Sequence, residues 1–135
     1  MSKLQDFLLN EFKLEDVTTE VNIKGFPEPF VIKSIKQAQN KVIERSCRTV
    51  TFNRKTHEKE IETDRDLYAT RLIAACCIVP NFKDAALQAK LGVMGEEDCV
   101  ETMLDSGTYA VLLKAVTDIN GFDTNINDNI EEAKN

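Results

Sequence analysis

The side chains with the greatest capacity for chemistry in this sequence are one histidine, four cysteines and two groups of closely spaced carboxylates. The histidine, His57, stands in the polar run RKTHEK. Metal binding or acid–base catalysis requires a second ligand or an orienting group in a partly dry environment. An exposed polar turn offers neither, so we predict no chemical role for His57.

The two groups of carboxylates are Asp64 with Asp66 and the run Glu96–Asp98. Each stands at the expected start of a helix, where negative charge compensates the partial positive charge of the helix N-terminus. The sequence contains no calcium-binding loop, no phosphate-binding glycine loop and no nucleophile elbow around a serine. It therefore predicts a protein that is not an enzyme and has no catalytic, cofactor-binding or metal-binding residues.

The cysteines are Cys47, Cys76, Cys77 and Cys99. Cys76 and Cys77 are adjacent in an apolar run and would point about 100° apart on a helix. No C-x-x-C pair and no neighbouring histidine accompanies them, which disfavours a zinc site. We predict that the cysteines serve as small apolar core residues of a cytosolic protein, with a reactive thiol or a disulfide as the alternative.

The elements that would position these residues begin with a short amphipathic helix. Residues 3–12 carry apolar side chains at helical spacing. Beyond it, apolar residues alternate with polar ones on both sides of the break Gly25–Pro29. This pattern predicts two strands joined as a hairpin, whose prolines keep the turn from continuing either strand.

A helix is expected over residues 36–47, capped by Ser34. Its predicted inner face consists of four residues at helical spacing: Ala38, Val42, Ile43 and Cys47. Residues 48–63 then alternate again around a polar turn, which favours a second hairpin. The run KEIE inside this stretch could equally extend a helix, so both alternatives stay open.

The second half of the chain predicts helices. Asp64 begins a long apolar helix that ends near Val79, because Pro80 cannot continue it. Shorter helices are expected at 84–91 with Gly92 as the left-handed end, from Glu96 onward, and from Asp105 or Ser106 to Gly121.

These patterns predict an α+β, predominantly α-helical fold, with five or so short helices and one or two β-hairpins in the N-terminal half. At 135 residues the chain is long enough to bury one core. We expect a single globular domain over residues 1–121. Residues 122–135 are rich in Asn and Asp, and we expect an acidic, flexible C-terminal tail there.

Composition narrows the range of partners. No apolar run approaches the roughly 18 residues of a membrane span, and the N-terminus lacks the pattern of a signal peptide. We therefore expect a soluble intracellular protein. The net charge of −6 falls entirely in residues 68–135. An acidic half disfavours direct nucleic-acid binding, and it suits either a basic protein partner or solubility alone.

Several apolar residues stand where partner surfaces often lie. Phe26, Phe30 and Phe52 sit on or beside the predicted hairpins, where packing of the hairpins onto the helices is the favoured role and partner contact is the alternative. In the last helix and the tail we select four further residues as predicted partner contacts alongside Phe26 and Phe30: Tyr109, Phe122, Ile126 and Ile130.

The order of short motifs in the chain resembles one known family. The run from Tyr68 to Ala75 is followed by Pro80, by Leu87-x-x-x-Leu91-Gly92-Val93-Met94-Gly95, and by Met103-Leu104. Ser106-Gly107, Tyr109-x-x-Leu112, Gly121-Phe122-Asp123 and Glu132-Ala133-Lys134-Asn135 complete the series. Each motif is common by itself, but their joint order is similar to that of the XkdN-like tail assembly chaperones of phages and phage-like elements.

The resemblance implies a non-enzymatic role in the assembly of long phage tails. Members of the family bind the long, helical, aggregation-prone tape measure protein and leave as tail tube subunits polymerise around it. The implied partners are therefore the tape measure protein and the tail tube protein, with a homo-oligomer possible. The implied location is the host cytoplasm rather than the mature virion. A structural tail component retained in the virion, such as a tube or completion protein, is the alternative.

Overall fold

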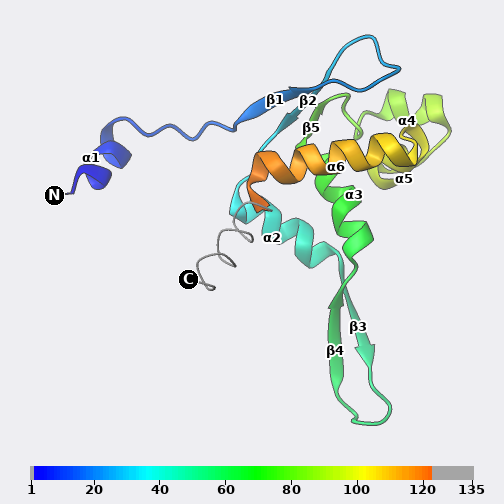
Figure 1. The fold of residues 1–135 in the computed structure, drawn as a ribbon. Helices are drawn as coiled ribbons and strands as arrows, with labels where there is room; N and C mark the ends of the chain where they lie inside the picture. Colours follow the sequence, from blue (N-terminus) through cyan, green and yellow to red (C-terminus); the bar gives the residue numbers. More distant parts are fainter. Residues whose placement is uncertain (1, 123–135) are drawn as a thin grey trace, which may run out of the picture.

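The computed structural model of the protein describes residues 2–122 and has an α+β architecture (Figure 1). The helices are α1 (Lys3–Asn10), α2 (Gln37–Ser46), α3 (Arg65–Cys76), α4 (Ala85–Leu91), α5 (Glu96–Met103) and α6 (Ser106–Asn120). The strands are β1 (Thr18–Val21), β2 (Phe30–Lys33), β3 (Arg48–Phe52), β4 (Lys59–Thr63) and β5 (Cys77–Val79). The predicted fold class is confirmed, and so are both hairpins.

A three-stranded antiparallel sheet of order β1-β2-β5 forms one side of the body. The first hairpin supplies β1 and β2, with Val21 paired to Phe30. The third strand, β5, was not predicted. The sequence predicted a helix that continues to Val79, but α3 ends at Cys76 and the chain continues as a strand. A residue before proline is disfavoured in the α region, so the chain ahead of Pro80 becomes extended. Val79 then pairs with Val31 of β2.

The core lies between this sheet and the helices that follow it. Helix α3 contacts α2, α5 and α6, while α6 lies across α3 and alongside β1 and β2 (Figure 1). The fully buried side chains come from the sheet, from the segment after β5 and from these helices: Ile32, Ile73, Phe82, Val100, Leu112 and Val116. Cys47, Cys76, Cys77 and Cys99 are also buried and carry no disulfide, which confirms their predicted core role.

Helix ends in the second half follow the predicted local signals. Asp64 Oδ1 accepts a hydrogen bond from the Leu67 amide at 3.1 Å and caps α3. Asp105 Oδ1 accepts from the Thr108 amide at 3.0 Å and caps α6. Gly92 and Gly121 end α4 and α6 in the left-handed conformation, at φ 71° and 73°. Only glycine adopts this conformation without steric cost, so both stop signals are set by the local sequence.

Two predictions about α2 are wrong. Ser34 does not cap the helix; its hydroxyl accepts a hydrogen bond from the Val17 amide and ties the N-terminal segment to the end of β2. Ala38 and Val42 face water, and Val42 is 66% exposed. The helix contacts α3 through the hydrogen bond from the Tyr68 hydroxyl to Asn40 and, at its C-terminal end, through the hydrogen bonds from Arg71 to Ser46. Most of its other side chains are exposed.

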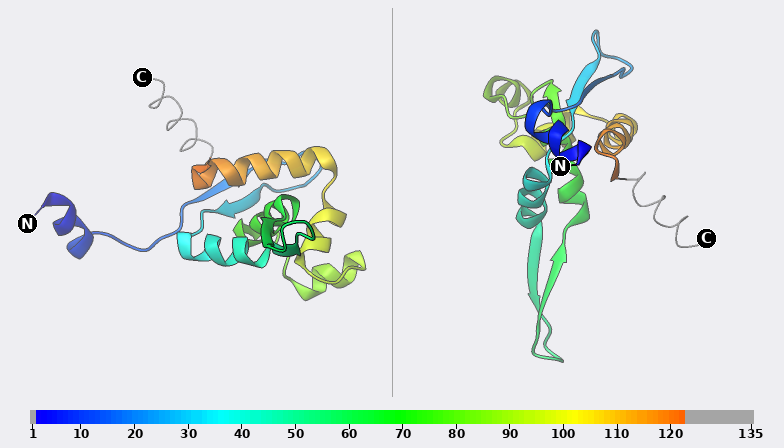
Figure 2. Two further views of the ribbon diagram at one scale, coloured as in Figure 1. Left: turned by 90° about the horizontal axis from the view of Figure 1, so that it is seen from below. Right: turned by 90° about the vertical axis from the view of Figure 1, so that its left-hand side faces the viewer.

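Two elements project from the body. The second hairpin, β3 with β4, extends away from the junction of α2 and α3 (Figure 1). Helix α1 has no buried residue and stands apart at the end of an extended segment, as Figure 1 and the left view of Figure 2 show. The hairpin settles the alternative left open for residues 48–63, because all five residues of β3 pair with the five residues of β4.

The boundary expected at residue 122 stays a prediction. Phe122 is half-buried and packs against the core, while residues 123–135 lie outside the described part of the chain. Within residues 2–122, no helix combines the length and the apolar character that crossing a membrane would require.

Candidate partner-binding surfaces

The structure distributes the predicted contact residues over several places. Phe26 lies in the β1–β2 turn and is 37% exposed. Phe30 is 3% exposed, so its side chain belongs to the core. Its ring packs edge-on against that of Phe26, with 5.0 Å between the ring centroids. Tyr109 and Phe122 are half-buried on and just beyond α6. Ile126 and Ile130 lie outside the described residues, so the structure does not bring this set together as one surface.

Phe26 forms one wall of a groove that we call the apolar groove. It has a volume of about 330 Å³ and lies between the β1–β2 turn, the end of β5, α4 and α5. Its lining residues are Phe26, Pro27, Glu28, Pro29, Phe30, Val79, Pro80, Leu87 and Met103. All except Glu28 are apolar, so the groove can hold apolar side chains of a partner. Sequence reasoning found the Phe26 side of it but not the β5 side, because the pairing of β5 with β2 is non-local.

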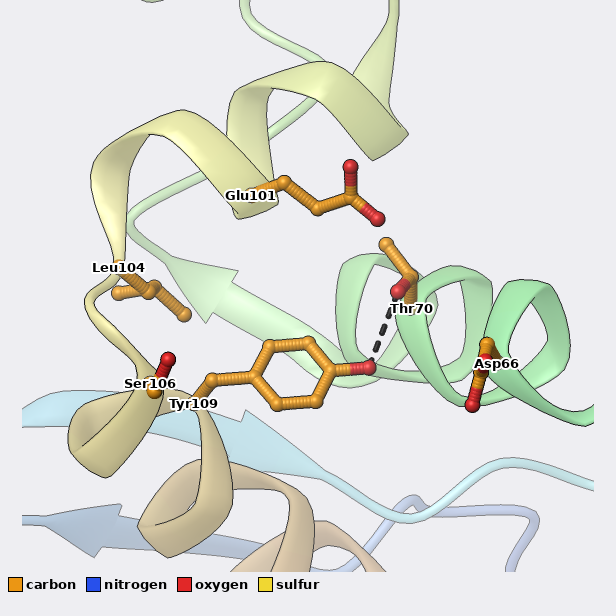
Figure 3. A pocket seen from close by; sticks show the side chains of 6 residues that line it. All are labelled: Asp66, Thr70, Glu101, Leu104, Ser106 and Tyr109. Atoms are coloured by element: carbon orange, nitrogen blue, oxygen red, sulfur yellow. Dashed lines mark hydrogen bonds between the residues drawn. The ribbon is translucent and has the colours of Figure 1, made fainter.

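Tyr109 lies in a second cavity of about 370 Å³, between α3, α5 and α6 (Figure 3). Its hydroxyl is 3.0 Å from Thr70 Oγ1, and the ring forms one side of the cavity. Asp66 and Glu101 stand at the rim and are exposed. The cavity combines carboxylates with an aromatic wall, which suits contact with a basic or amphipathic side chain rather than catalysis.

The acidic start of α5 takes part in a contact that sequence reasoning missed. Arg71 Nε donates to Glu97 Oε1 at 2.6 Å, and Arg71 Nη1 donates to the Ser46 carbonyl oxygen and hydroxyl at 2.8 Å. The hydrogen bond from Arg71 lowers the pKa of the Glu97 carboxyl. Glu97 is therefore both a helix-dipole partner, as predicted, and a link between α3 and α5. Pairing across two helices leaves no signal in the local sequence.

Three of the cysteines, Cys76, Cys77 and Cys99, have no features of reactive thiols. Burial raises the pKa of Cys77 to about 12, and burial also raises the pKa of Cys76 and Cys99. Thiolates are the nucleophilic form, so these groups are held in the unreactive state near neutral pH. His57 lies in the β3–β4 turn at φ 59°, with its ring 6.1 Å from that of Phe52. Over the described range 2–122, no three metal-ligating side chains come together.

A third surface is the face of the second hairpin that we call the hairpin face. Cross-strand partners in an antiparallel pair share a face, so Val50 and Ile61 lie together with Phe52 and Lys59. Val50, Phe52 and Ile61 are 64%, 60% and 66% exposed. Arg48 lies two residues before Val50 and therefore on the same face of the strand. Exposed apolar groups gathered in this way mark an interaction site more often than isolated ones do.

Comparison with known proteins gives consistent results in sequence and in structure. A protein YqbN from Bacillus subtilis (strain 168) is 28% identical over 116 residues, which cover 85% of this chain and 77% of the relative. The crystal structure of the protein YqbN matches with a TM-score of 0.66 at 20% identity, over 85% of this chain and 93% of that chain. The two share one fold.

The family model of the phage XkdN-like tail assembly chaperone protein, TAC, matches residues 4–134. This range includes every element from α1 to α6 except the first residue of α1. It also includes the motifs on which the resemblance was recognised, apart from the final residue, Asn135. The chain therefore belongs to the family of phage XkdN-like tail assembly chaperone proteins.

Proposed function

We propose that this protein is a phage tail assembly chaperone that binds the tape measure protein and assists assembly of the tail tube without catalysis. The observation that supports this proposal most strongly is the match of the family model over residues 4–134. The role places the protein in the host cytoplasm during assembly, with the tail tube protein as a second partner. Release before completion leaves it out of the mature virion.

The apolar groove is the surface that suits such a client best. A groove of about 330 Å³ with one charged residue among its lining side chains can hold two or three apolar side chains from one face of a helix. The client that we propose is an amphipathic helical segment of the tape measure protein. Contacts of this size are modest, which is compatible with release when tube subunits arrive.

Phe26 is the contact residue that the geometry supports directly, because it is exposed at the rim of the groove. Tyr109 belongs to the separate acidic cavity, and we propose it as a contact for basic residues of the same client. Phe122, Ile126 and Ile130 stay proposed contacts at the C-terminal end. Phe30 is almost fully buried, so we propose that it contributes part of the groove lining and packs against Phe26, with only a small area open to the client.

Co-expression tests the proposal. The tape measure protein encoded in the same phage is expected to be recovered in the soluble fraction and to co-purify with this chain. Phe26→Ser is expected to reduce co-purification several-fold. Val42→Ser removes an exposed apolar side chain outside the groove and is the matched control, expected to behave as the parent protein. Absence of both co-purification and a gain in solubility would exclude the proposed role.

The alternative role, a structural component of the tail, predicts a different location. Quantitative mass spectrometry of purified particles discriminates the two. A chaperone is expected to be absent or far below the copy number of the tube protein. Stoichiometric amounts in washed particles would favour the structural role.

A further inference from the structure

The hairpin face needs a cover that the described residues do not supply. Strands β3 and β4 pack chiefly on each other, and an isolated two-stranded hairpin is only marginally stable in water. Val50, Phe52 and Ile61 stand on one face, all more than half exposed. The opposite face is polar and satisfied: the Thr49 and Thr51 hydroxyls donate to strand carbonyl oxygens. Only one face of the hairpin therefore lacks a partner.

Charge distinguishes the two faces and narrows the choice of partner. The register places Arg48 and Lys59 on the apolar face, whereas Glu60 and Glu62 fall on the opposite one. Two copies packed through their hairpin faces would bring like charges together, which is destabilising. A segment that combines apolar side chains with carboxylates complements the hairpin face in both respects.

The end of α6 brings such a segment to the side of the body from which the hairpin projects, beside α2. Asn120 Oδ1 accepts a hydrogen bond from the Ile35 amide at 3.0 Å, which fixes the last turn of α6 against the body. Phe122 and Arg65 line one cavity of about 460 Å³. Arg65 is the first residue of α3 and stands two positions after Thr63, where β4 ends. The chain thus leaves the described region beside the first turn of α2. The ten residues of that helix, about 15 Å long, separate this point from the start of the hairpin at Arg48, a distance that the following segment must cross first.

The 13 residues beyond this point have the required composition and length. They contain Ile126 and Ile130 at spacing four, the carboxylates Asp123, Asp128, Glu131 and Glu132, and one lysine. At roughly 3.3 Å per residue they can reach about 40 Å, whereas a five-residue strand is about 17 Å long. The segment is therefore long enough to lie along the whole hairpin.

We propose that residues 123–135 dock in cis on the hairpin face, with Ile126 and Ile130 against Val50, Phe52 and Ile61 and with the carboxylates near Arg48 and Lys59. Attachment at Phe122 gives the segment a high effective concentration at the hairpin, so weak contacts suffice. The apolar groove lies at the β1–β2 turn, on the other side of the body from the hairpin, and stays open (Figure 1). The inference does not depend on which partner the groove binds.

A spin label tests directly whether residues 123–135 lie close to the hairpin face. Asn127→Cys provides a single accessible thiol, because Cys47, Cys76, Cys77 and Cys99 are buried. A nitroxide at position 127 is expected to broaden the methyl resonances of Val50 and Ile61 in the full chain. The methyls of Leu87 on α4, which lines the distant apolar groove, are the internal control and are expected to stay sharp.

Mixing separates cis from trans docking. Spin-labelled, isotopically unlabelled chains are combined with methyl-labelled chains that lack the nitroxide. Docking in cis predicts no broadening at Val50 or Ile61 in this mixture. Broadening in the mixture as strong as that in chains that carry both the nitroxide and the methyl labels would overturn the proposal in favour of exchange between copies. Sharp resonances in both samples would overturn docking altogether.

Charge exchange provides a second, independent test at low ionic strength. Lys59→Glu alone, and Glu131→Lys with Glu132→Lys, are each expected to speed amide hydrogen exchange across residues 48–63 several-fold. Combining the three substitutions is expected to return the exchange rates toward those of the parent protein. If the increases in exchange rate of the separate variants simply add in the combined variant, the proposed pairing is contradicted. Lys90→Glu, on α4, is the control for a change of charge elsewhere and is expected to leave these rates unchanged.

Discussion

Arg71 Nε lies 2.6 Å from Glu97 Oε1, which joins the middle of α3 to the first turn of α5. The same guanidinium reaches the C-terminal end of α2 through Ser46, at 2.8 Å from the carbonyl oxygen. One side chain therefore fixes the mutual positions of three helices, and two of these flank the acidic cavity that holds Tyr109. Both partners of the ion pair are partly exposed, which limits the strength of the electrostatic attraction.

Removal of this guanidinium is expected to destabilise the fold measurably. Arg71→Ala breaks three charge-assisted hydrogen bonds, and we expect a loss of about 1–2 kcal/mol in the free energy of unfolding, after allowing for partial exposure. Chemical denaturation measures it. The control is Lys114→Ala, which removes an exposed ion pair with Asp118 on α6 and is expected to cost less than about 0.5 kcal/mol. Equal losses in the two variants would contradict the linking role of Arg71.

The lowered pKa of Glu97 gives stability a defined pH dependence. A carboxyl with a folded-state pKa below its unfolded value binds fewer protons when folded, so its contribution is present above the unfolded pKa, about 4.3 for Glu. That contribution is lost as the pH falls through the folded pKa. We expect Glu97→Gln to be less stable than the parent protein at pH 6 and to lose less stability between pH 6 and pH 3. Parallel stability curves for the two proteins would refute this assignment.

The buried thiols are expected to resist modification in the native state. Cys77, with a pKa of about 12, carries a negligible thiolate fraction at pH 8, and the other three cysteines are likewise buried. A thiol reagent such as dithionitrobenzoate is therefore expected to react slowly with the native protein and rapidly with all four cysteines in guanidinium chloride. Rapid reaction of any one of them in the native protein would show that its site opens locally.

Side chains on α2 and α3 differ in burial, so shortening them to alanine is expected to change the free energy of unfolding by different amounts. Ile73 is fully buried on α3, so Ile73→Ala is expected to cost about 2–5 kcal/mol. Val42 on α2 was predicted from its spacing to face inward but is exposed, so Val42→Ala is expected to change stability by less than about 0.5 kcal/mol. Thermal and denaturant unfolding of the two variants compare them. A large loss for Val42→Ala would restore the original interpretation of the helix pattern.

The features that could be predicted from the sequence are those decided by neighbouring residues. Gly92 ends α4, as expected, because a residue tolerant of positive φ is a local requirement. Asp84, expected as the first residue of this helix, caps it through its short polar side chain. The second hairpin was one of two interpretations, since its alternation and its charge pattern fit different elements. Its register decided the question by placing Val50 opposite Ile61.

The features that could not be predicted depend on distant parts of the chain. Strand β5 exists because Val79 meets Val31, and an apolar run before a proline fits a helix equally well when that partner is not known. The partner of Glu97 was hidden for the same reason. Phe26 and Phe30 were selected together from the sequence, and their burial differs because Phe30 lies beside Leu87 of α4 and Met103 of α5, which the local sequence does not show. Their contact with a partner stays a prediction.

The central sheet has a consequence for synthesis of the protein. Strands β1 and β2 are complete by Lys33, yet their third partner ends at Val79. Phe30 and Ile32 acquire their buried environment only when β5, α3 and α6 have been translated, since these elements supply the neighbouring side chains. At elongation rates of about 5–20 residues per second the nascent chain therefore presents an unfinished apolar sheet for several seconds. The apolar residues of the first half of this chain are buried only by elements of the second half, so folding on the ribosome is completed late.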